Sequence, residues 1–419
     1  MKIIWFSNTP ANSDEYLDLE LKGTGGWLKS LDFILQDKVD LHIVFYTRLR
    51  INNFKYLNTN YYPIHLGEKN LFEKIFDRFI TKIKFKEDLN KYLHIINQVE
   101  PDLIHVHGSE MPFGFVQEMT NIPVVISIQG NITICKHKYF SGIEKSYLKW
   151  YDSIIQNFID NNSFLKNYQR FKLWENGEKI ILKNCKYIIG RTDWDKRISR
   201  ILSPNSKYFY VSEILRPSFY KISQKKKEKN KFLIFTTNGN TLYKGFETLC
   251  QSLSIINGLG FNDIEWIVAG ISASDSIVRI TQKKLLNKYP TQNLKLLGCL
   301  NEDELYSNLL NIDLYVMASH IENSPNNLSE AMILGIPSIS TFVGGTGSLI
   351  QNNVDGILIQ DGDPWAMAGA IIELKSNPEK MEEIGKNGQV SAKRRHNSNQ
   401  IVDDLLNVYL NIIKKHDVF

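Results

Sequence analysis

The sequence predicts an α/β protein built from two doubly wound domains. In both halves, short apolar runs typical of buried parallel strands alternate with segments of helical periodicity. Residues 221–231 form a polar, charged run without apolar periodicity, as in a solvated linker. At 419 residues the chain is also too long for one hydrophobic core. We therefore expect domains at 1–220 and 232–395, this linker between them, and a last amphipathic helix within 396–419.

The composition argues against a membrane span and a signal peptide. Hydrophobic residues make up 43% and charged residues 23% of the chain, as in ordinary globular proteins. No run of eighteen apolar residues occurs, and residues 1–6 lead at once into a polar loop. We therefore expect a cytoplasmic protein.

The formal net charge of +5 is small for this length. It lacks the concentrated positive stripe of a nucleic-acid-binding protein, so no nucleic-acid partner is expected. A mild positive excess suits an anionic nucleotide substrate and an anionic membrane surface equally well. Residues 71–96 form a basic amphipathic stretch that favours packing on a sheet, with peripheral contact to the inner membrane as the alternative.

No metal site is expected. The four cysteines show neither metal-ligand nor redox spacing, and the nine histidines form no zinc-binding pattern. We interpret the cysteines as free and mostly buried thiols: Cys135, Cys185, Cys250 and Cys299.

The first predicted strand, at residues 2–6, is followed by a glycine-rich turn that contains Gly25 and Gly26 and opens a helix. Such a turn lets the backbone approach a phosphate closely. Leu28 stands where a dinucleotide fingerprint needs glycine, so a dinucleotide site is disfavoured. Many glycine turns bind nothing, and the residues alone leave both interpretations open.

Three further strand ends of the first half carry polar side chains. The predicted strands at 101–107 and 124–128 end near His107 and Gln129, and the strand at 185–190 leads to Arg191. Ligands of open α/β sheets collect beyond such carboxyl ends, which makes His107 and Gln129 candidates for contact with a sugar or an acceptor. Arg191 suits contact with a phosphate or an acceptor, and an ion pair with Asp193 or Asp195 is the alternative. His105 lies within its strand and is expected to be structural.

The second half begins with a strand at 232–237, a loop containing Lys244 and Gly245, and a helix. This order predicts phosphate binding, with Lys244 as a point charge. Strands at 265–270 and 294–298 continue the pattern, and the second of them ends at Gly298 and Cys299.

The most informative stretch follows the predicted strand at 312–318. Ser324 is expected to cap a helix that has Pro325 at its first position and ends before Gly335. Glu322 precedes the helix and Glu330 lies about two turns inside it. A helix start with free amides binds anions, and the residues that would form this site are Asn323, Ser324, Pro325, Asn326 and Asn327. An ordinary surface helix with two solvated acids is the alternative.

This stretch resembles a known family. Glu322 to Glu330 matches the E-x7-E signature of retaining glycosyltransferases of the GT-B fold, family 4, and the flanking residues 318–319 and 330–332 are also similar. The resemblance implies that Glu330 holds the ribose hydroxyls of the donor and that Glu322 contacts the transferred sugar. It also places Gly25, Gly26 and Lys244 at the donor diphosphate, and the backbone from Gly298 and Cys299 onward at the nucleobase.

The resemblance implies two Rossmann-like domains facing a cleft, with the terminal helix crossing back to the first domain. It implies a retaining hexosyltransferase that uses a nucleoside diphosphate sugar and a saccharide or lipid-linked acceptor, without a metal or other cofactor. We expect Glu322, Lys244 and Gln129 as catalytic residues. Two positions depart from the family pattern: Gln129, where histidine is common, and Gly239, where arginine is usual. A sugar-nucleotide epimerase and a non-catalytic sugar-nucleotide-binding protein are the alternatives.

Overall fold

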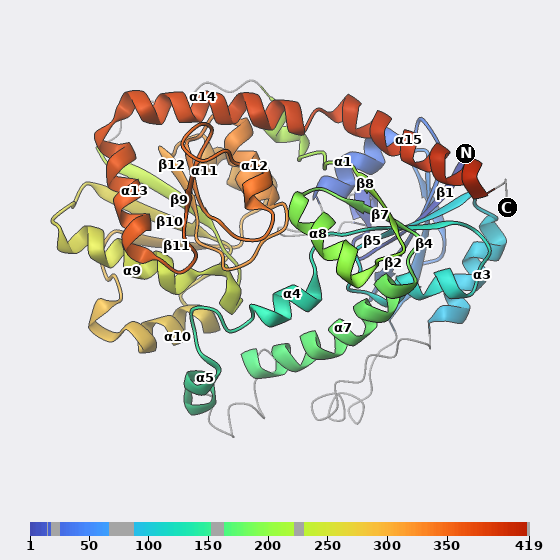
Figure 1. The fold of residues 1–419 in the computed structure, drawn as a ribbon, viewed down its shortest axis with the longest axis horizontal. Coiled ribbons are helices and arrows are strands. Elements are labelled where there is room, and N and C mark those ends of the chain that lie inside the picture. The colour runs from blue at the N-terminus through green and yellow to red at the C-terminus, as the bar shows by residue number, and fades with distance from the viewer. Residues whose placement is uncertain (15, 18–25, 67–87, 152–162, 222–229, 417–419) are drawn as a thin grey trace. The chain divides into compact units, whose positions relative to one another are not determined.

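The computed structural model describes residues 1–14, 16–17, 26–66, 88–151, 163–221 and 230–416 (Figure 1). The chain forms two compact units, each containing one largely parallel sheet. The first unit comprises Met1–Lys136, Lys166–Ile214 and His396–Phe419, and the second comprises His137–Leu165 and Leu215–Arg395. The predicted α/β class with two doubly wound sheets is therefore confirmed.

The sheet of the first unit has eight strands in the order β3-β4-β2-β1-β5-β6-β7-β8, and only the β3–β4 pair is antiparallel. Counted without β3, this is the doubly wound order in which the chain starts in the middle and reverses direction between β1 and β5. The strands are β1 (Lys2–Ser7), β2 (Asp40–Thr47), β3 (Phe54–Tyr56), β4 (Thr59–His65), β5 (Leu103–His107), β6 (Val124–Ser127), β7 (Tyr187–Gly190) and β8 (Lys207–Tyr210).

The sheet of the second unit has six parallel strands in the order β11-β10-β9-β12-β13-β14. The order reverses between β9 and β12, so the loops that follow these two strands become neighbours. The strands are β9 (Phe232–Thr237), β10 (Ile264–Ala269), β11 (Leu294–Gly298), β12 (Leu314–Met317), β13 (Ser338–Thr341) and β14 (Ile357–Ile359).

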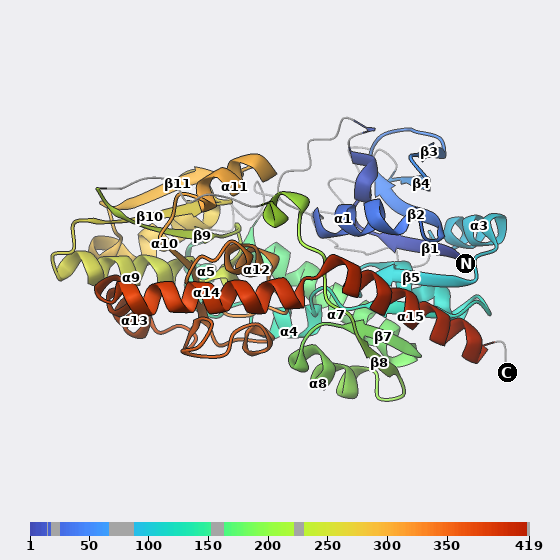
Figure 2. The ribbon, with the colours of Figure 1, turned by 90° about the horizontal axis from the view of Figure 1, so that it is seen from above.

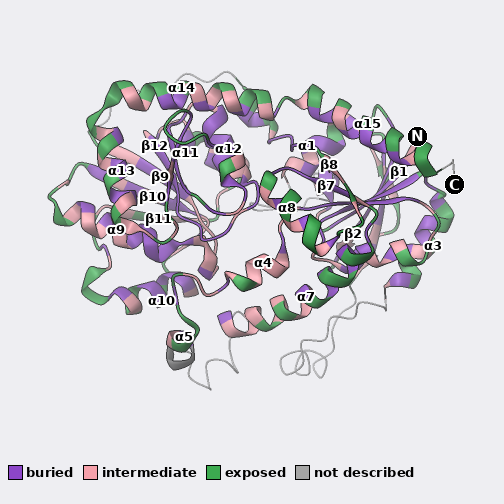
Figure 3. Cartoon of the chain, in the orientation of Figure 1, coloured by how far each residue is buried: buried purple, intermediate pink, exposed green. Residues whose placement is uncertain are grey.

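Helices cover the sheets, and the central strands are buried on both faces (Figure 3). In β1, for example, Ile3 and Trp5 pack into one apolar cluster while Ile4 and Phe6 pack into another. Two-sided burial explains why these strands read as continuous apolar runs. The main α-helices are α1 (Gly26–Leu35), α3 (Leu89–Val99), α4 (Ile132–His137), α5 (Lys145–Tyr151), α7 (Phe164–Asn184), α8 (Asp193–Leu202), α9 (Phe246–Gly258), α10 (Ser276–Leu285), α11 (Glu302–Leu309), α12 (Asn326–Ile333), α13 (Pro364–Ser376), α14 (Pro378–Arg395) and α15 (Ser398–His416).

The division into units differs from the sequence-based boundaries in two places. Residues 137–165 group with the second unit, because Gly142 lies so close to Glu247 and His320 that a side chain at 142 would overlap both. The chain also enters the second unit at Leu215, before the predicted linker at 221–231. Residues 222–229 of that linker lie outside the described residues.

The terminal helix α15 packs on the sheet of the first unit, as predicted (Figure 2). A buried chain of hydrogen bonds fixes it there. Trp5 Nε1 donates to Tyr409 Oη at 3.0 Å, and hydrogen bonds of 2.6 Å each join Tyr409 Oη to His105 Nδ1 and His105 Nε2 to Ser127 Oγ. Burial lowers the pKa of His105 to about 3, so this histidine is neutral and structural, as expected.

We expect the Tyr409→Phe variant to lose about 1–3 kcal/mol of unfolding free energy, because it leaves two buried polar groups without their partner. Urea unfolding measures this loss. Tyr16→Phe is the matched control, since Tyr16 is 54% exposed, and it should change stability by less than about 0.5 kcal/mol. Equal stability of the two variants would contradict a structural role for the Tyr409 hydroxyl.

Among the described helices, none is both long enough and apolar enough to cross a bilayer. Most of the basic amphipathic stretch at 71–96 lies outside the described residues, since these resume at residue 88. Its proposed membrane contact stays a prediction.

Candidate active site

The candidate site of the second unit lies where the strand order reverses. Lys244 ends the short 3-10 helix Leu242–Lys244 that follows β9, and Glu322 lies in the loop between β12 and α12. Because β9 and β12 are neighbours, the two loops meet beyond the carboxyl ends of the strands. Open α/β sheets bind their ligands at this location.

Lys244 and Glu322 are in direct contact. Lys244 Nζ donates to Glu322 Oε1 at 2.5 Å, and Ser319 Oγ donates to the same oxygen at 2.8 Å. The amide of His320 also donates to the carbonyl of Tyr243 at 2.8 Å, which joins the two backbones. The two predicted catalytic residues are thus held side by side, although 78 positions separate them in the sequence.

Gly245 makes this approach of the two loops feasible. Its φ is +69°, and a Cβ at this position would overlap the carbonyl of Ala318 at the end of β12. Only glycine adopts this backbone geometry without strain and also leaves room for the neighbouring strand end. The Lys-Gly pair therefore combines a cation with a close backbone contact.

Helix α12 begins one residue later than predicted. Pro325, not Ser324, is the N-cap, and its backbone is extended with ψ at 115°. No side chain hydrogen-bonds to the first turn as a cap, so the expected cap by Ser324 is wrong. Asn327 uses its side-chain amide to bond Thr237, which leaves the main-chain amides at 326 and 327 as the groups available to an anion.

Glu330 is paired with an arginine that the sequence analysis missed. Its side chain is buried, and Arg216 Nε and Nη2 donate to its two oxygens at 2.7 and 2.6 Å. Burial raises the pKa of Glu330, and the Arg216 guanidinium opposes this rise. Arg216 lies 114 positions away, in a segment that the sequence analysis assigned to the first domain, so neither spacing nor domain assignment pointed to it.

His320 joins the site loop to two other segments. The His320 side chain is 2% exposed; Nδ1 donates to Asp361 at 2.5 Å and Nε2 donates to Glu247 at 2.6 Å. Because both ring nitrogens face carboxylates, the imidazole is a cation. Burial lowers the pKa of His320, but the hydrogen bonds that the ring donates to Asp361 and Glu247 outweigh burial and raise the pKa to about 9. Lys138 is the further charged group in this cluster, 3.9 Å from Asp361.

The pKa of His320 predicts a pH-dependent stability. A histidine whose pKa rises from 6.5 to about 9 on folding contributes stability that is complete below about pH 6.5 and lost as pH rises through 9. The contribution is on the order of 3 kcal/mol. Urea unfolding between pH 6 and pH 9.5 should show this decline in the wild type and a flatter profile in His320→Gln. Identical pH profiles would contradict the cationic state.

The remaining donor candidates lie at the end of β11. Gly298 has a φ of +73°, with open space around its Cβ position, and the Cys299 side chain is exposed. β11 is the edge strand of the sheet, two strands from β9. The amide of Gly298 donates to Ile271 at 2.9 Å and its carbonyl accepts from Gly270 at 2.6 Å. The predicted nucleobase contact stays a prediction.

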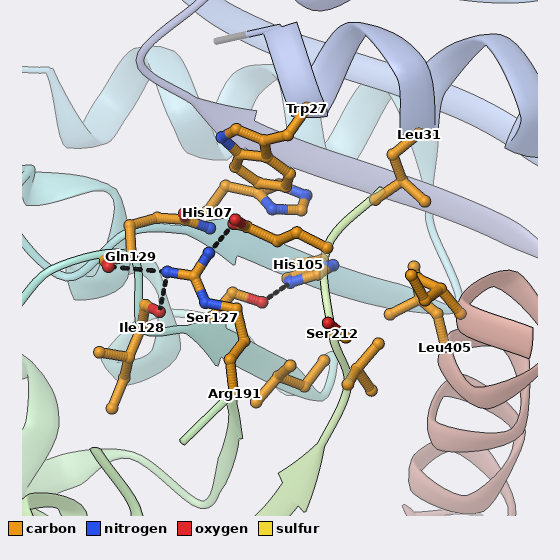
Figure 4. A pocket seen from close by; sticks show the side chains of 14 residues that line it. Trp27, Leu31, His105, His107, Ser127, Ile128, Gln129, Arg191, Ser212 and Leu405 are labelled. Atoms are coloured by element: carbon orange, nitrogen blue, oxygen red, sulfur yellow. Dashed lines mark hydrogen bonds and ion pairs between the residues drawn. The ribbon is translucent and has the colours of Figure 1, made fainter. Parts of the chain in front are cut away.

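The candidate acceptor residues of the first unit line a small cavity (Figure 4). His107, Gln129 and Arg191 lie around it, together with Trp27 from α1 and Leu405 from α15. The cavity encloses about 30 Å³, which admits one water-sized group and not a sugar ring. Gly26 is the first residue of α1, and Gly25 lies outside the described residues.

The Arg191 side chain is buried, and its guanidinium already binds groups of the protein. It forms an ion pair with Glu213 and donates to the carbonyls of Ile128 and Gln129 at 3.1 and 2.7 Å. It therefore fixes the loop that carries Gln129. Burial, His105 and the Arg191 cation hold the pKa of His107 well below its usual range, so the ring is neutral. Neither ring nitrogen of His107 bonds a described residue.

Glu110 is a second residue that the sequence analysis missed. It follows β5, and its Oε1 accepts a hydrogen bond at 2.6 Å from Asn8, which follows β1. The bond thus spans the strands between which the sheet of the first unit reverses direction. Burial raises the pKa of Glu110 to about 7, and the Glu178 carboxylate adds to the rise.

Within the described parts of the chain, no group of three or more His, Cys, Asp or Glu side chains is placed to hold a metal ion. None of the four cysteines, all of which lie in described segments, forms a disulfide, and Cys185 and Cys250 are buried. The thiols are therefore interpreted as structural, except for the exposed Cys299.

Most of the second unit matches a known family model. Residues 218–391 match the family described as Glycosyl transferases group 1. The matched segment contains Lys244, Glu322 and Glu330. The resemblance to glycosyltransferases of the GT-B fold is therefore confirmed.

Two curated relatives carry the sequence likeness. The chain is 27% identical over 174 residues to the capsular polysaccharide biosynthesis glycosyltransferase CapM of Staphylococcus aureus, which covers 42% of this chain and 44% of that protein. It is 29% identical over 113 residues to N-acetyl-alpha-D-glucosaminyl L-malate synthase of Bacillus anthracis, which covers 27% and 30%. The chain thus spans less than half the length of the curated relatives that it matches.

Solved structures share the fold over nearly the whole chain. Sucrose-phosphate synthase from Thermosynechococcus elongatus gives a TM-score of 0.77 at 15% identity and covers 99% of this chain and 100% of that one. HepE of Anabaena, solved in complex with UDP and glucose, gives 0.63 at 14% identity and covers 97% and 99%. At these identities the likeness shows the fold alone.

Proposed function

We propose that the protein is a retaining glycosyltransferase. It moves a hexose or N-acetylhexosamine from a nucleoside diphosphate sugar to a hydroxyl of a saccharide or lipid-linked acceptor. The observation that carries this proposal is the arrangement in the second unit: Lys244, Glu322 and the uncapped start of α12 meet where the strand order reverses.

In this proposal the donor diphosphate binds to the amides at the start of α12 and to Lys244. Both groups are positive and already in place, so they stabilise the charge that grows on the diphosphate as the sugar leaves. In the absence of donor, Glu322 neutralises Lys244. On binding, the diphosphate replaces Glu322 at Lys244, and the carboxylate turns to a hydroxyl of the sugar. We propose that no metal takes part, because Lys244 and the helix start offset most of the negative charge of the diphosphate.

The acceptor is proposed to bind the first unit with one hydroxyl directed at the small cavity of His107 and Gln129, since that cavity does not admit a sugar ring. Neither side chain works as a base there, since the pKa of His107 is far below neutral and an amide does not titrate. We propose that both orient the acceptor by hydrogen bonds and that the leaving phosphate takes the acceptor proton. CapM acts in capsular polysaccharide biosynthesis, which supports a role in bacterial surface polysaccharide or lipopolysaccharide synthesis.

A two-stage assay tests the proposal. First, UDP, GDP and their sugars are screened in EDTA-containing buffer for a raised melting temperature, because a ligand that binds the folded state stabilises it by mass action. Second, the sugars that bind are incubated with and without saccharide acceptors while diphosphate release and product stereochemistry are followed. Acceptor-dependent release with retention supports the transferase. Epimerised donor identifies an isomerase, and binding without turnover identifies a binding protein; either result overturns the proposal.

A further inference from the structure

The ion pair between Arg216 and Glu330 fixes the orientation of both side chains. Arg216 precedes the 3-10 helix Pro217–Tyr220, and its guanidinium lies 5.0 Å above the ring of Phe219. Phe219 is itself buried in the core of the second unit. Packing on this ring and two parallel hydrogen bonds hold the guanidinium in one orientation, and the guanidinium in turn holds the carboxylate.

The carboxylate retains unused acceptor capacity. An ionised carboxylate offers about four lone-pair sites, of which a bidentate arginine uses two. The described residues supply no other hydrogen-bond donor to Glu330. Two acceptor sites therefore remain, with directions fixed by Arg216.

Glu330 is also placed suitably for a ribose hydroxyl. It lies four positions after Asn326, so it shares a face of α12 with the first amide of the helix, about 6 Å along the axis. A nucleotide whose phosphates sit on the helix start would bring its ribose to this depth. The two remaining acceptor sites point to opposite sides of the carboxylate, because Arg216 uses the inner site of each oxygen, so the site on the ligand side accepts one hydroxyl.

We propose that Arg216 is the positioning residue that makes Glu330 a selective acceptor for the ribose 2′-hydroxyl. The inference rests on the proposed function and adds the residue that sets the preference for ribonucleotides. Arg216 does this in two ways. It fixes the carboxylate plane, and its charge opposes the rise that burial imposes on the pKa of Glu330, which favours the form of the carboxyl that accepts hydrogen bonds.

The test compares the affinities of UDP with 2′-deoxy-UDP, and of GDP with 2′-deoxy-GDP, by calorimetric titration. In the wild type, loss of one hydrogen bond to a charged acceptor should make the 2′-deoxy nucleotide bind about tenfold to a hundredfold more weakly than the ribonucleotide, a difference called the affinity gap below. Arg216→Gln is expected to reduce this gap to about threefold or less, as is Glu330→Gln, which keeps the shape and removes the charge. Arg279→Gln is the matched control on the exposed face of α10, and it should retain the full gap.

A pH series separates positioning from a merely structural role. Without Arg216, burial raises the pKa of Glu330 further, so nucleotide affinity of Arg216→Gln should fall as pH drops from 8 to 5.5 while that of the wild type changes less. Arg216→Lys keeps the positive charge but lacks the planar guanidinium, so its affinity gap should lie between those of the wild type and Arg216→Gln. Arg216→Lys also serves as the test variant if Arg216→Gln does not fold.

The outcomes distinguish the two proposals. If no nucleotide binds the wild type, the proposed function fails. If nucleotides bind but the wild type does not discriminate against the 2′-deoxy forms, or if the Arg216 variants keep the full gap, the role of Arg216 is overturned and the donor site stands.

Discussion

Replacing Lys244 with alanine is expected to slow release of the nucleoside diphosphate by about 10²- to 10³-fold, the usual cost of removing one preorganised donor from a developing negative charge. Lys244 is already held in the site by Glu322, so its charge meets the diphosphate without a large rearrangement. The loss should appear mainly in kcat, because the charge on the bridging oxygen grows in the transition state.

Rates of diphosphate release from the nucleotide sugar that binds, measured at saturating donor, test this prediction. Lys244→Arg keeps the charge on a differently shaped group and should recover part of the rate. Lys288→Ala removes an exposed lysine of the same unit and should leave the rate unchanged. A Lys244→Ala rate within a few-fold of the wild type would remove Lys244 from the catalytic group.

Gly245→Ala should be the most destabilising single-methyl change in the site. The new Cβ would overlap the carbonyl of Ala318, and alanine at a φ of +69° is strained as well. Together these effects should lower the unfolding free energy by about 2–5 kcal/mol.

Gly258→Ala is the matched control, because Gly258 ends the same helix, α9, and a Cβ there meets no atom within 4 Å. That variant should be neutral or more stable by up to about 1 kcal/mol. Urea unfolding of both variants gives the comparison. Similar stabilities would show that the two site loops are not as closely packed as the structure describes.

The sequence predicted the central strands of both sheets, because buried parallel strands leave unbroken apolar runs that are visible without any partner. It did not predict β3, β4 and β8, which lie toward the two edges of the first sheet. β12 was expected at 312–318 and spans Leu314–Met317. The predicted start of α12 was wrong by one residue. A proline is compatible with the N-cap and with the first helical position, so the sequence does not distinguish the two for Pro325.

The partners of the site residues were harder to predict. Glu330 and Lys244 were found from local spacing, but Arg216 is 114 positions from Glu330, and Asp361 and Glu247 are 41 and 73 positions from His320. Such pairs are created by the strand order, which brings distant loops to one edge of the sheet. No periodicity or motif within a short window carries that information.

The central claim is that a nucleoside diphosphate binds the second unit at the start of α12. Amide hydrogen exchange with and without saturating UDP or GDP tests it most directly, because it reports which backbone amides the ligand covers. We predict increased protection concentrated at residues 322–330 and 239–246, and in Glu330→Gln the same protection only at a higher nucleotide concentration. Nucleotide binding that protects other segments and leaves these two unchanged would contradict the account.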